Sequence, residues 1–222
     1  KKKIDRLIKS KNKTLTINVS QYNLKIPKTN YSNSKIQIVH AGANRKLHNI
    51  SKMIHLIHQL PNEIKKKIFF TVIGSDNLKK KEKLIIKLKC EKYIKIISFL
   101  KYDQYINVIK KADICIGLFG DTEKSQNVIS NFIVTSTNLG KVIITKNTNA
   151  AKIYLKKNIG IFLLKRPEKI NFTNFMKMYV NSSKFRLKLK HKSKRVYLQN
   201  FEINKNLKKL DLFLKQLFWI NN

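Results

Sequence analysis

The sequence predicts a doubly wound α/β fold with a parallel sheet, on three observations. Short runs of apolar residues recur between residues 35 and 165, and they are apolar throughout, as strands buried on both faces of a sheet are. Segments with apolar residues at helical spacing separate these runs, which is the pattern of βαβ units. All six glycines lie between residues 42 and 160, and most of them adjoin an expected strand. We therefore expect a Rossmann-like sheet with helices on both faces, followed by amphipathic helices at the C-terminal end.

The expected elements can be placed in chain order. Strands are expected at residues 36–41, 68–73, 94–98, 114–118, 142–145 and 159–164. A helix with an apolar repeat follows the first strand and ends before Pro61, and a second helix is expected around Ile85. Asp103 is expected to cap the helix that leads into the fourth strand. Beyond residue 166 the strands stop, and lysine-rich amphipathic helices are expected at residues 175–179, 185–201 and 207–219.

These elements divide the chain of 222 residues into three parts. Residues 1–34 are polar and are expected to be a linker or the remnant of a preceding N-terminal domain. Residues 35–165 form the expected core domain. Residues 166–222 are expected to pack on that core or to reach toward another domain. Because the chain begins with Lys1 instead of Met, a fragment, a split subunit and a remnant of a larger protein are all open interpretations.

The charge balance is strongly basic, since 48 lysines and arginines against 12 acidic residues give a formal net charge of +36. Such a charge is typical of proteins that bind nucleic acid or an anionic membrane surface. Only five of the basic residues are arginines, whose planar fork usually reads phosphates and base edges. Heavy use of lysine, asparagine and isoleucine is also what an AT-rich coding sequence would give. A basic nucleic-acid or anionic-membrane binding protein therefore stays as an alternative, and we expect no specific nucleic-acid partner.

The two cysteines, Cys90 and Cys115, are too few for a disulfide framework or a metal cluster. Cys115 lies within an apolar run and is expected to be a core residue. No apolar run reaches the roughly 18 residues that cross a bilayer, and the first residues show no secretory signal pattern. These features predict a cytoplasmic protein, with peripheral contact at the inner face of the membrane as an alternative.

Two glycine-containing loops follow expected strands and have the residues to hold an anion. The first opens at Gly42 and contains Arg45, Lys46 and His48, and the second spans residues 117–131. Glycine lets the backbone come close to a bound group and helix N-termini present free N–H groups, so both loops favour anions. For the second loop, an ordinary polar connection with a capping residue is the alternative. Neither loop contains the dinucleotide fingerprint or a P-loop.

In a parallel sheet these loops share the carboxyl edge of the strands, where open α/β sheets bind ligands. The loops after the first, second and fourth strands and residues 99–102 are therefore expected to converge on one crevice. Arg45, Lys46 and Lys124 would supply positive charge there, which suits a diphosphate with an attached base. The alternative is that these cations are ordinary solvated side chains.

Together these motifs resemble the C-terminal half of family 4 glycosyltransferases of the GT-B fold. The resemblance covers about residues 35–215. It is sharpest at one motif, which reads Gly117-Leu118-Phe119-Gly120-Asp121-Thr122, then Lys124, then Val128-Ile129-Ser130-Asn131. Members of one bacterial branch carry a similar glycine-phenylalanine-glycine-threonine run, a lysine, and a valine-isoleucine-proline-asparagine run. The resemblance implies a domain that binds a nucleotide-activated sugar.

The resemblance also implies roles for the residues at matching positions. The donor diphosphate would lie near Gly42, Arg45, Lys46, His48, Gly120, Asp121, Thr122, Lys124 and Asn131. The base and ribose would lie near Gly74, Phe99, Leu100, Lys101 and Thr135. The implied reaction is transfer of a hexosyl group to an acceptor hydroxyl with the anomeric configuration retained, helped by stabilising the charge of the leaving diphosphate. Neither a metal nor a cofactor is expected.

Four substitutions depart from the family pattern. Thr135 stands where the family usually has a glutamate or glutamine that binds the ribose, and Phe132 stands where it has a lysine. Ser130 replaces a proline, and Asn49 replaces a glycine. These departures imply a weakened donor site, and they keep a catalytically inactive interaction module as an alternative.

Enzymes of the GT-B fold take the acceptor, and usually the catalytic base, from an N-terminal Rossmann domain. The pattern of such a domain does not precede residue 35 in this sequence, so the catalytic residues are expected to lie outside it. The expected partners are a nucleotide-sugar donor, a glycan or lipid-linked acceptor, and an N-terminal Rossmann domain or subunit.

Overall fold

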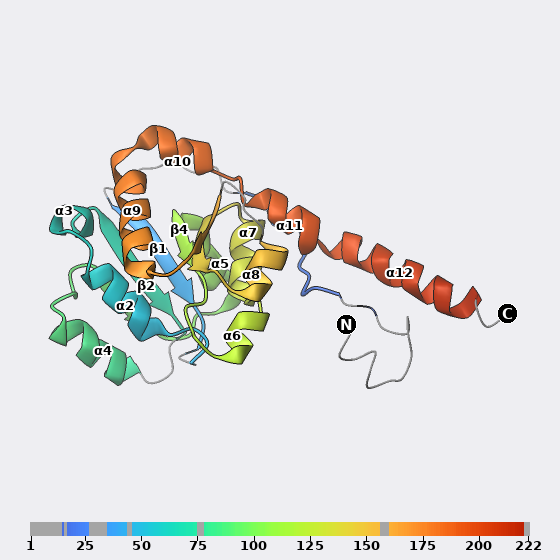
Figure 1. Ribbon diagram of the computed structural model, residues 1–222, viewed down its shortest axis with the longest axis horizontal. Helices are drawn as coiled ribbons and strands as arrows, with labels where there is room; N and C mark the ends of the chain where they lie inside the picture. Colours follow the sequence, from blue (N-terminus) through green and yellow to red (C-terminus); the bar gives the residue numbers. More distant parts are fainter. Residues whose placement is uncertain are drawn as a thin grey trace.

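The computed structural model describes residues 15, 17–26, 35–43, 46–74, 78–155 and 160–219. Within these residues six parallel strands form one sheet in the order β3-β2-β1-β4-β5-β6 (Figure 1). The strands are β1 (Ile36–Ala41), β2 (Ile68–Ile73), β3 (Ile94–Ile97), β4 (Ile114–Ile116), β5 (Val142–Lys146) and β6 (Ile161–Leu164). The strand order reverses between β1 and β4, so the predicted doubly wound, parallel α/β fold is confirmed.

Helices occupy the connections between the strands and the whole C-terminal part. Those before β6 are α2 (Ile50–His58), α3 (Asn62–Lys65), α4 (Leu78–Lys87), α5 (Tyr102–Lys111), α6 (Glu123–Asn127), α7 (Asn131–Asn138) and α8 (Asn149–Tyr154). Those after β6 are α9 (Glu168–Asn181), α10 (Ser183–Leu189), α11 (Lys194–Asn200) and α12 (Ile203–Trp219).

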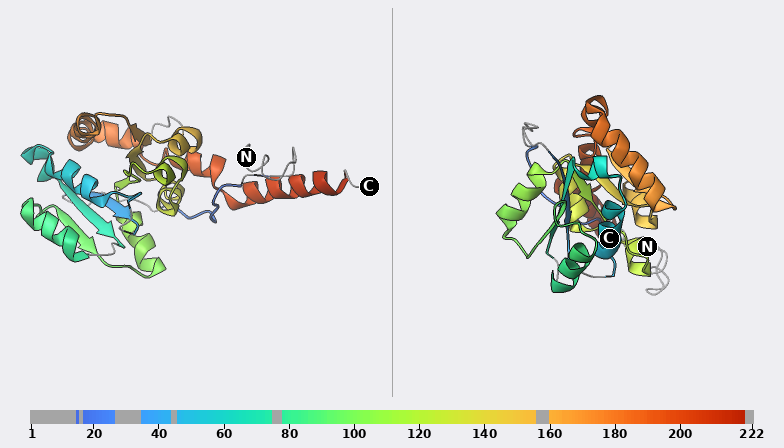
Figure 2. Two further views of the ribbon diagram at one scale, coloured as in Figure 1. Left: turned by 60° about the horizontal axis from the view of Figure 1, so that its bottom comes forward. Right: turned by 90° about the vertical axis from the view of Figure 1, so that its left-hand side faces the viewer.

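The sheet is buried on both faces, each against its own set of helices. On one face α2, α3, α4, α9 and α10 pack over strand residues such as Ile38 and Phe70, and Met53 and Phe172 are among their buried side chains. On the other face α5, α7, α8 and α11 pack over Val39 and its neighbours. Two turned views show these layers on either side of the strands (Figure 2). Strands covered on both faces explain the continuous apolar runs in the sequence.

The expected strands are confirmed, with small differences at their ends. β1 and β2 have the expected bounds, whereas β3 ends one residue earlier than expected and β5 runs one residue further. β4 ends at Ile116, two residues earlier than expected. The Gly117 N–H still donates to the Ile144 carbonyl of β5 at 2.7 Å, whereas the Leu118 N–H donates to the Thr145 side chain, Oγ1, at 3.1 Å. β6 begins at Ile161, and Ile159 lies outside the described residues.

Two expectations about helices are wrong. α5 begins at Tyr102 and takes Lys101 as its cap residue, so Asp103 lies inside the first turn instead of capping the helix. Residues 185–201 do not form one helix, because α10 ends at Leu189 and α11 begins five residues later, at Lys194. His191 in the connection has a positive φ of 59°, a left-handed conformation that a continuous α-helix does not allow.

The segment at residues 15 and 17–26 contacts the C-terminal helices and does not pair with a strand of the sheet. The Tyr197 hydroxyl of α11 donates to the Gln21 carbonyl at 2.7 Å, and Gln21 forms an isolated bridge with Glu202. α12 extends away from the sheet and the helices that cover it (Figures 1 and 2). Of the helices in the described ranges, none is both long and apolar enough to span a membrane.

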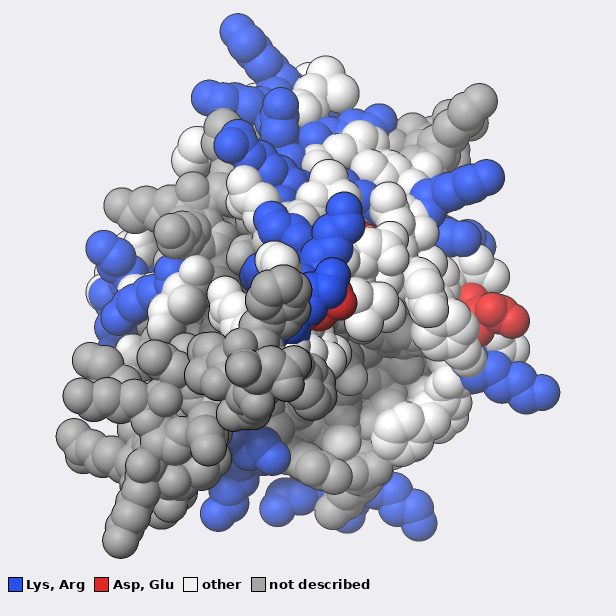
Figure 3. Space-filling view, turned by 90° about the vertical axis from the view of Figure 1, so that its right-hand side faces the viewer, with Lys and Arg blue, Asp and Glu red and all other residues white. Residues whose placement is uncertain are grey.

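The basic side chains are spread over many elements. The face in Figure 3 carries lysine and arginine side chains in several separate places, with few acidic ones among them. α4 alone exposes Lys79, Lys80, Lys83 and Lys87. Among the described residues, the basic side chains on this face and on α4 therefore occupy separate places on different elements.

Candidate functional site

A cavity of about 330 Å³ opens at the carboxyl ends of β1 and β2. Its lining comes from the ends of β1 and β2, the loops after β1, β2 and β3, α5, and the cap and first residues of α7. It consists of Ala41, Gly42, His48, Ile73, Gly74, Phe99, Leu100, Tyr105, Ser130, Asn131 and Phe132. This is the edge at which doubly wound sheets bind ligands, beside the point where the strand order reverses. Of the expected site residues, the structure brings six together here, namely Gly42, His48, Gly74, Phe99, Leu100 and Asn131.

Gly42 gives the cavity its inner wall because it leaves room for a ring. A Cβ atom at Gly42 would lie 2.2 Å from Cε1 of His48, so the imidazole packs directly on the glycine backbone. Gly74 does the same for Phe99, whose ring would meet a Cβ atom at 3.1 Å. Gly74 also has a positive φ of 76°, which favours glycine. Both glycines therefore let an aromatic side chain lie over the strand end.

The buried His40 ring packs against the ring of His48. Its ring meets the His48 ring edge-on at 5.1 Å between centroids and the Phe132 ring at 5.7 Å. The buried Nδ1–H of His40 donates to the Ile116 carbonyl at 2.7 Å, since a carbonyl can only accept. Burial lowers the pKa of His40 to about 3, so this histidine is neutral at physiological pH. An uncharged, fixed ring thus holds His48 at the cavity wall.

The loop after β4 is joined to the loop after β1 by backbone hydrogen bonds. The Gly120 N–H donates to the Leu47 carbonyl at 2.9 Å, and the Phe119 N–H donates to the His48 carbonyl at 3.3 Å. A Cβ atom at Gly120 would lie 2.5 Å from the Lys46 carbonyl oxygen, so only glycine fits. The two loops meet as expected, yet Gly120 fixes the His48 loop from behind and is not part of the cavity lining.

The N-terminus of α7 faces the cavity. Ser130 caps this helix, its hydroxyl accepting from the Ile133 N–H at 3.4 Å, and the next two residues, Asn131 and Phe132, line the cavity. The first N–H groups of a helix have no partner within it and carry a partial positive charge. An anion in the cavity would therefore meet donors from α7.

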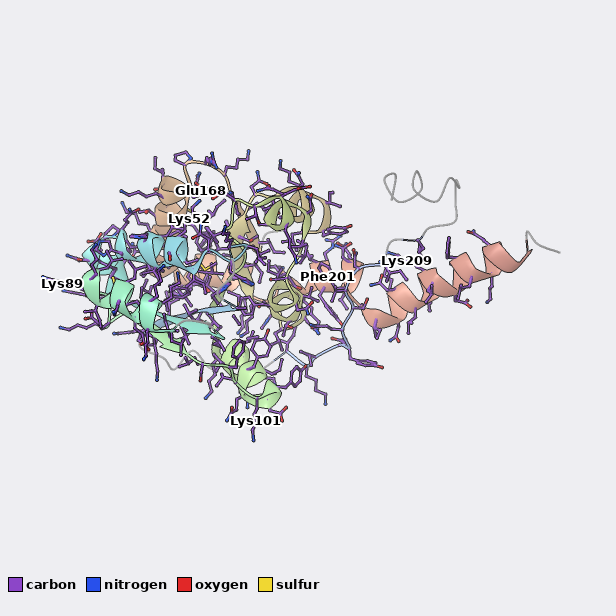
Figure 4. All side chains as sticks on the ribbon, turned by 90° about the horizontal axis from the view of Figure 1, so that it is seen from below. Lys52, Lys89, Lys101, Glu168, Phe201 and Lys209 are labelled. Carbon is purple, nitrogen blue, oxygen red and sulfur yellow. The ribbon has the colours of Figure 1, made fainter. Side chains whose placement is uncertain are left out.

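Asp121 belongs to a cluster of charges beside the cavity, not to its lining. Its carboxylate hydrogen-bonds Lys146, pairs with Arg166 at 3.3 Å and lies 3.9 Å from the Lys52 amine. Lys52 also reaches Glu168 at 3.2 Å, and Figure 4 labels these two residues close together at α2 and α9. The hydrogen bond from Lys146 holds the pKa of Asp121 below its ordinary value. The carboxylate is thus ionised and already surrounded by cations.

The remaining expected site residues lie outside the cavity lining. Thr122 caps α6, with its hydroxyl accepting from the Ser125 N–H at 3.2 Å. Lys46, Lys101 and Lys124 are exposed side chains, and Arg45 lies outside the described residues. Thr135 is buried, and its hydroxyl contacts the amide group of Gln21.

Five lining residues were not among the expected contacts, namely Ala41, Ile73, Tyr105, Ser130 and Phe132. Tyr105 comes from α5, and Ser130, noted in the sequence only as a departure from the family motif, caps α7. Ser130 could have been found, because a serine directly before a helix start is a capping signal. Tyr105 gives no such signal, since its role depends on how α5 packs against the sheet edge. No group of three or more histidine, cysteine, aspartate or glutamate side chains in the described part of the chain is arranged to hold a metal ion.

The strand order, the two helical layers and the cavity at the switch point define a Rossmann-like α/β domain of the kind found in GT-B glycosyltransferases. Neither a protein-family model nor a curated protein matches the chain. Solved structures of glycosyltransferases do match it, at sequence identities of 10–17%. At such identities the likeness shows the fold.

Three of these structures illustrate the match. A mutant of S. aureus TarM, solved with UDP, fondaparinux and α-GlcNAc-glycerol, is 13% identical with a TM-score of 0.76, covering 95% of this chain and 41% of TarM. Anabaena HepE with UDP and glucose is 14% identical at TM-score 0.68, covering 82% and 48%. A Rickettsia africae glycosyltransferase is 17% identical at TM-score 0.65, covering 83% and 48%. The chain therefore spans less than half the length of these proteins.

Proposed function

We propose that this chain is the donor-binding domain of a retaining glycosyltransferase of family 4, in which the cavity holds a nucleotide diphosphate sugar. The observation that carries the proposal is the cavity itself, which combines glycine-backed loops, an aromatic side chain and a helix N-terminus at one sheet edge. Among the similar structures, TarM was solved with UDP and HepE with UDP-glucose, which supports a nucleotide sugar as the ligand class. An open cavity of about 330 Å³ suits part of such a ligand.

Within the proposal, the diphosphate lies between the His48 loop and the N-terminus of α7. Gly42 makes room for the His48 ring at this wall, and the N–H groups after Ser130 donate to phosphate oxygens. Arg45, Lys46, Thr122 and Lys124 remain proposed contacts from the surrounding loops. Asp121 fits this role poorly, because a carboxylate repels a diphosphate and this one is already paired with three cations.

The base lies against the loop after β3 in the proposed complex. Phe99 is 67% exposed although it packs on Gly74, so one ring face is open for stacking. Leu100 lines the same wall, and Lys101 lies at its exposed edge. Thr135 is held by Gln21 and does not reach the cavity as a lining residue.

The proposed chemistry is transfer of a hexosyl group to an acceptor hydroxyl on a glycan or a lipid-linked acceptor. The residues named here act on the leaving diphosphate, whose negative charge the helix N-terminus and nearby cations stabilise in place of a metal ion. An acceptor-binding Rossmann domain or partner subunit supplies the catalytic residues. The domain acts in the cytoplasm, with contact at the inner membrane face when the acceptor is lipid-linked.

Calorimetric titration with UDP, GDP and ADP tests the proposal together with one substitution. Asn131→Glu places a carboxylate at the first position of α7, where it suits the helix dipole but repels a diphosphate. We expect one of the nucleotides to bind the wild-type chain, and Asn131→Glu to weaken that binding at least about tenfold, or about 1.4 kcal/mol.

Asn149→Glu is the matched control. Asn149 is an exposed first residue of α8, follows a threonine cap, and lies away from the cavity lining. The substitution Asn149→Glu makes the same change of charge at the same helix position as Asn131→Glu, and it should leave nucleotide affinity unchanged. Absence of binding at millimolar concentrations of all three nucleotides would contradict the proposal and favour an inactive interaction module.

A further inference from the structure

α12 projects from the domain with an apolar side that the described elements leave largely open. Ile203, Leu207, Leu210 and Leu214 recur at intervals of four, three and four positions, which places them on one side of an α-helix. We call this side the leucine face. Leu207 is 53% exposed, Leu214 is 41% exposed and Leu210 is half-buried. Figure 4 shows α12 extending beyond Phe201, with Lys209 along its length. A continuous apolar stripe on a projecting helix marks an interaction surface.

The first turns of α12 are fixed to the domain, so the leucine face has a defined place. Asn206 is buried, and its side-chain amide donates to the Ser20 hydroxyl at 2.6 Å. Directly before the helix, the carbonyl of the buried Phe201 accepts from the Gln21 N–H at 3.1 Å. Beyond Asn206, every residue at positions 207–216 is exposed or half-buried. The helix is therefore anchored at its base and free of close packing along the rest of its described length.

The remaining surface of α12 is basic. Asp211 is the only acidic residue of the helix, and it pairs with Lys215 at 2.9 Å. Three further lysines of the helix are exposed and take part in none of the ion pairs of the described residues, namely Lys205, Lys208 and Lys209. An apolar stripe beside a lysine-rich surface is typical of helices that lie in the headgroup region of an anionic bilayer. The lysine stems can follow the apolar boundary while their amines reach phosphate groups.

The charge of the chain favours a bilayer over a second copy of the chain as the occupant of the leucine face. Two leucine faces packed together would bring the lysine-rich surfaces of two chains of net charge +36 into contact, and this repulsion opposes a dimer. An anionic bilayer attracts the same lysines and takes up the leucines at the boundary of its acyl chains. With five charged side chains among its 17 residues, α12 is suited to lie along such a surface and not to cross it.

We propose that α12 binds this chain to an anionic phospholipid surface. The leucine face lies at the acyl boundary, and Lys205, Lys208 and Lys209 contact headgroup phosphates. None of the residues that line the cavity belongs to α12. Membrane binding through this helix therefore goes beyond the proposed function and requires no nucleotide.

Tryptophan fluorescence during titration with vesicles tests the proposal. Trp219 is the only tryptophan of the chain and ends α12, so all tryptophan emission reports on this helix. The vesicles contain phosphatidylcholine alone or with about 30% phosphatidylglycerol, at about 0.1 M and about 0.5 M NaCl. We expect the emission to move to shorter wavelength with the anionic vesicles only. Part of the binding should persist at the higher salt, because salt does not screen the burial of leucines.

Three outcomes of this titration would overturn the proposal. Binding without an emission change, or binding that disappears completely at the higher salt, would mean that the basic surface as a whole adsorbs to the vesicles. An emission shift that grows with protein concentration in the absence of vesicles would identify a second copy of the chain as the occupant.

Two leucines of α12 provide a matched pair of variants. Leu214 belongs to the leucine face, whereas Leu212 is 60% exposed and lies on the opposite side of the helix. Leu214→Ser should weaken binding to the anionic vesicles about threefold to tenfold, and adding Leu207→Ser should weaken it further. Leu212→Ser makes the same change of helix propensity and should alter the binding less than about twofold. Equal effects of Leu214→Ser and Leu212→Ser would overturn the proposal.

A second matched pair tests the lysines. Replacing Lys205, Lys208 and Lys209 by glutamine should weaken binding to the anionic vesicles at least about tenfold at about 0.1 M NaCl. The control replaces three exposed lysines of α4 by glutamine, which lowers the net charge equally, namely Lys79, Lys80 and Lys83. This control should weaken the binding less than about threefold, because α4 does not lie at the bilayer. Equal weakening by the two sets would mean that net charge alone drives the binding and would overturn the assignment to α12.

Discussion

His40, a buried residue behind the cavity wall, makes the free energy of unfolding depend on pH. Its ring donates to the Ile116 carbonyl and supports His48, and its other nitrogen, Nε2, has no hydrogen-bond partner in the described part of the chain. Because burial lowers the pKa of His40 to about 3, the folded chain does not take up the proton that the unfolded chain binds near pH 6.5. The unfolded state therefore gains stability as the pH falls between these two values.

This difference predicts how a substitution changes the acid sensitivity of the fold. His40→Asn keeps a donor near the Nδ1 position but removes the titrating group. The free energy of unfolding of the wild type should fall with decreasing pH below about 6.5 more steeply than that of His40→Asn, by up to about 1.4 kcal/mol per pH unit. Urea unfolding between about pH 7 and pH 4.5 measures this. His55→Asn, at an exposed position, is the surface control and should keep the pH profile of the wild type. Parallel pH profiles of the wild type and His40→Asn would rule the prediction out.

At the scale of elements, the charges around Asp121 tie together four parts of the fold. Lys52 lies in the first turns of α2, Lys146 ends β5, Arg166 follows β6 and Glu168 begins α9. Four of the five ion pairs among the described residues lie in this cluster, in a chain that has only 12 acidic residues. The cluster therefore holds the carboxyl ends of β4, β5 and β6 against the helical layer beside the cavity.

Asp121→Asn should weaken this connection. Its carboxylate is about half exposed, so we expect a loss of only about 0.5–1 kcal/mol in the free energy of unfolding at neutral pH. Since the folded pKa of Asp121 is lowered, its contribution is complete above the unfolded pKa near 3.8 and is lost as the pH falls through the lower folded value. The two proteins should therefore become equally stable in acid.

Denaturant unfolding of Asp121→Asn at neutral and acidic pH measures this difference. The control is Asp211→Asn, which removes a single exposed pair with Lys215 on α12 and should cost at most about 0.5 kcal/mol. Equal losses in the two variants, or a loss in Asp121→Asn that persists at low pH, would mean that the cluster does not stabilise the fold through its charge.

The strands could be predicted almost to the residue, whereas the contacts of the site could not. Apolar runs buried on both faces leave a clear signal, and β1 and β2 have the bounds expected from the sequence. The break before α11 was missed because His191 adopts a left-handed conformation that its residue type does not announce. The contact between Gln21 and Thr135 joins residues 114 positions apart, and no local pattern encodes it.

The same distinction holds for the site residues. Gly42, Gly74 and Asn131 line the cavity, and they could be named from the sequence because glycines after strands and polar residues at helix starts follow from backbone geometry. Asp121 was expected at the diphosphate, but its place depends on Lys146 and Arg166, which approach it through the tertiary fold. Local geometry is thus readable from sequence, while the charge environment of a side chain is not.

At the scale of the whole molecule, the net charge of +36 works against compactness. Lysines are exposed on separate elements and pair with few acids, so their mutual repulsion acts across the whole surface. Salt screens repulsion between exposed charges over about 10 Å at 0.1 M, and it screens much less the partly buried pairs around Asp121. Added salt should therefore stabilise this fold.

We expect the Tm to rise by at least about 3 °C between about 50 mM and 500 mM NaCl, which corresponds to about 1 kcal/mol for a chain of this size. Differential scanning calorimetry measures the rise.

A variant in which Lys79, Lys80, Lys83 and Lys87 on α4 are replaced by glutamine tests the cause, because these side chains are exposed and lie on one helix. It should have the higher Tm at low salt and a smaller gain on adding salt. If wild type and variant gain equally, the salt effect arises from apolar burial or ion binding, and self-repulsion is not what limits the stability of this chain.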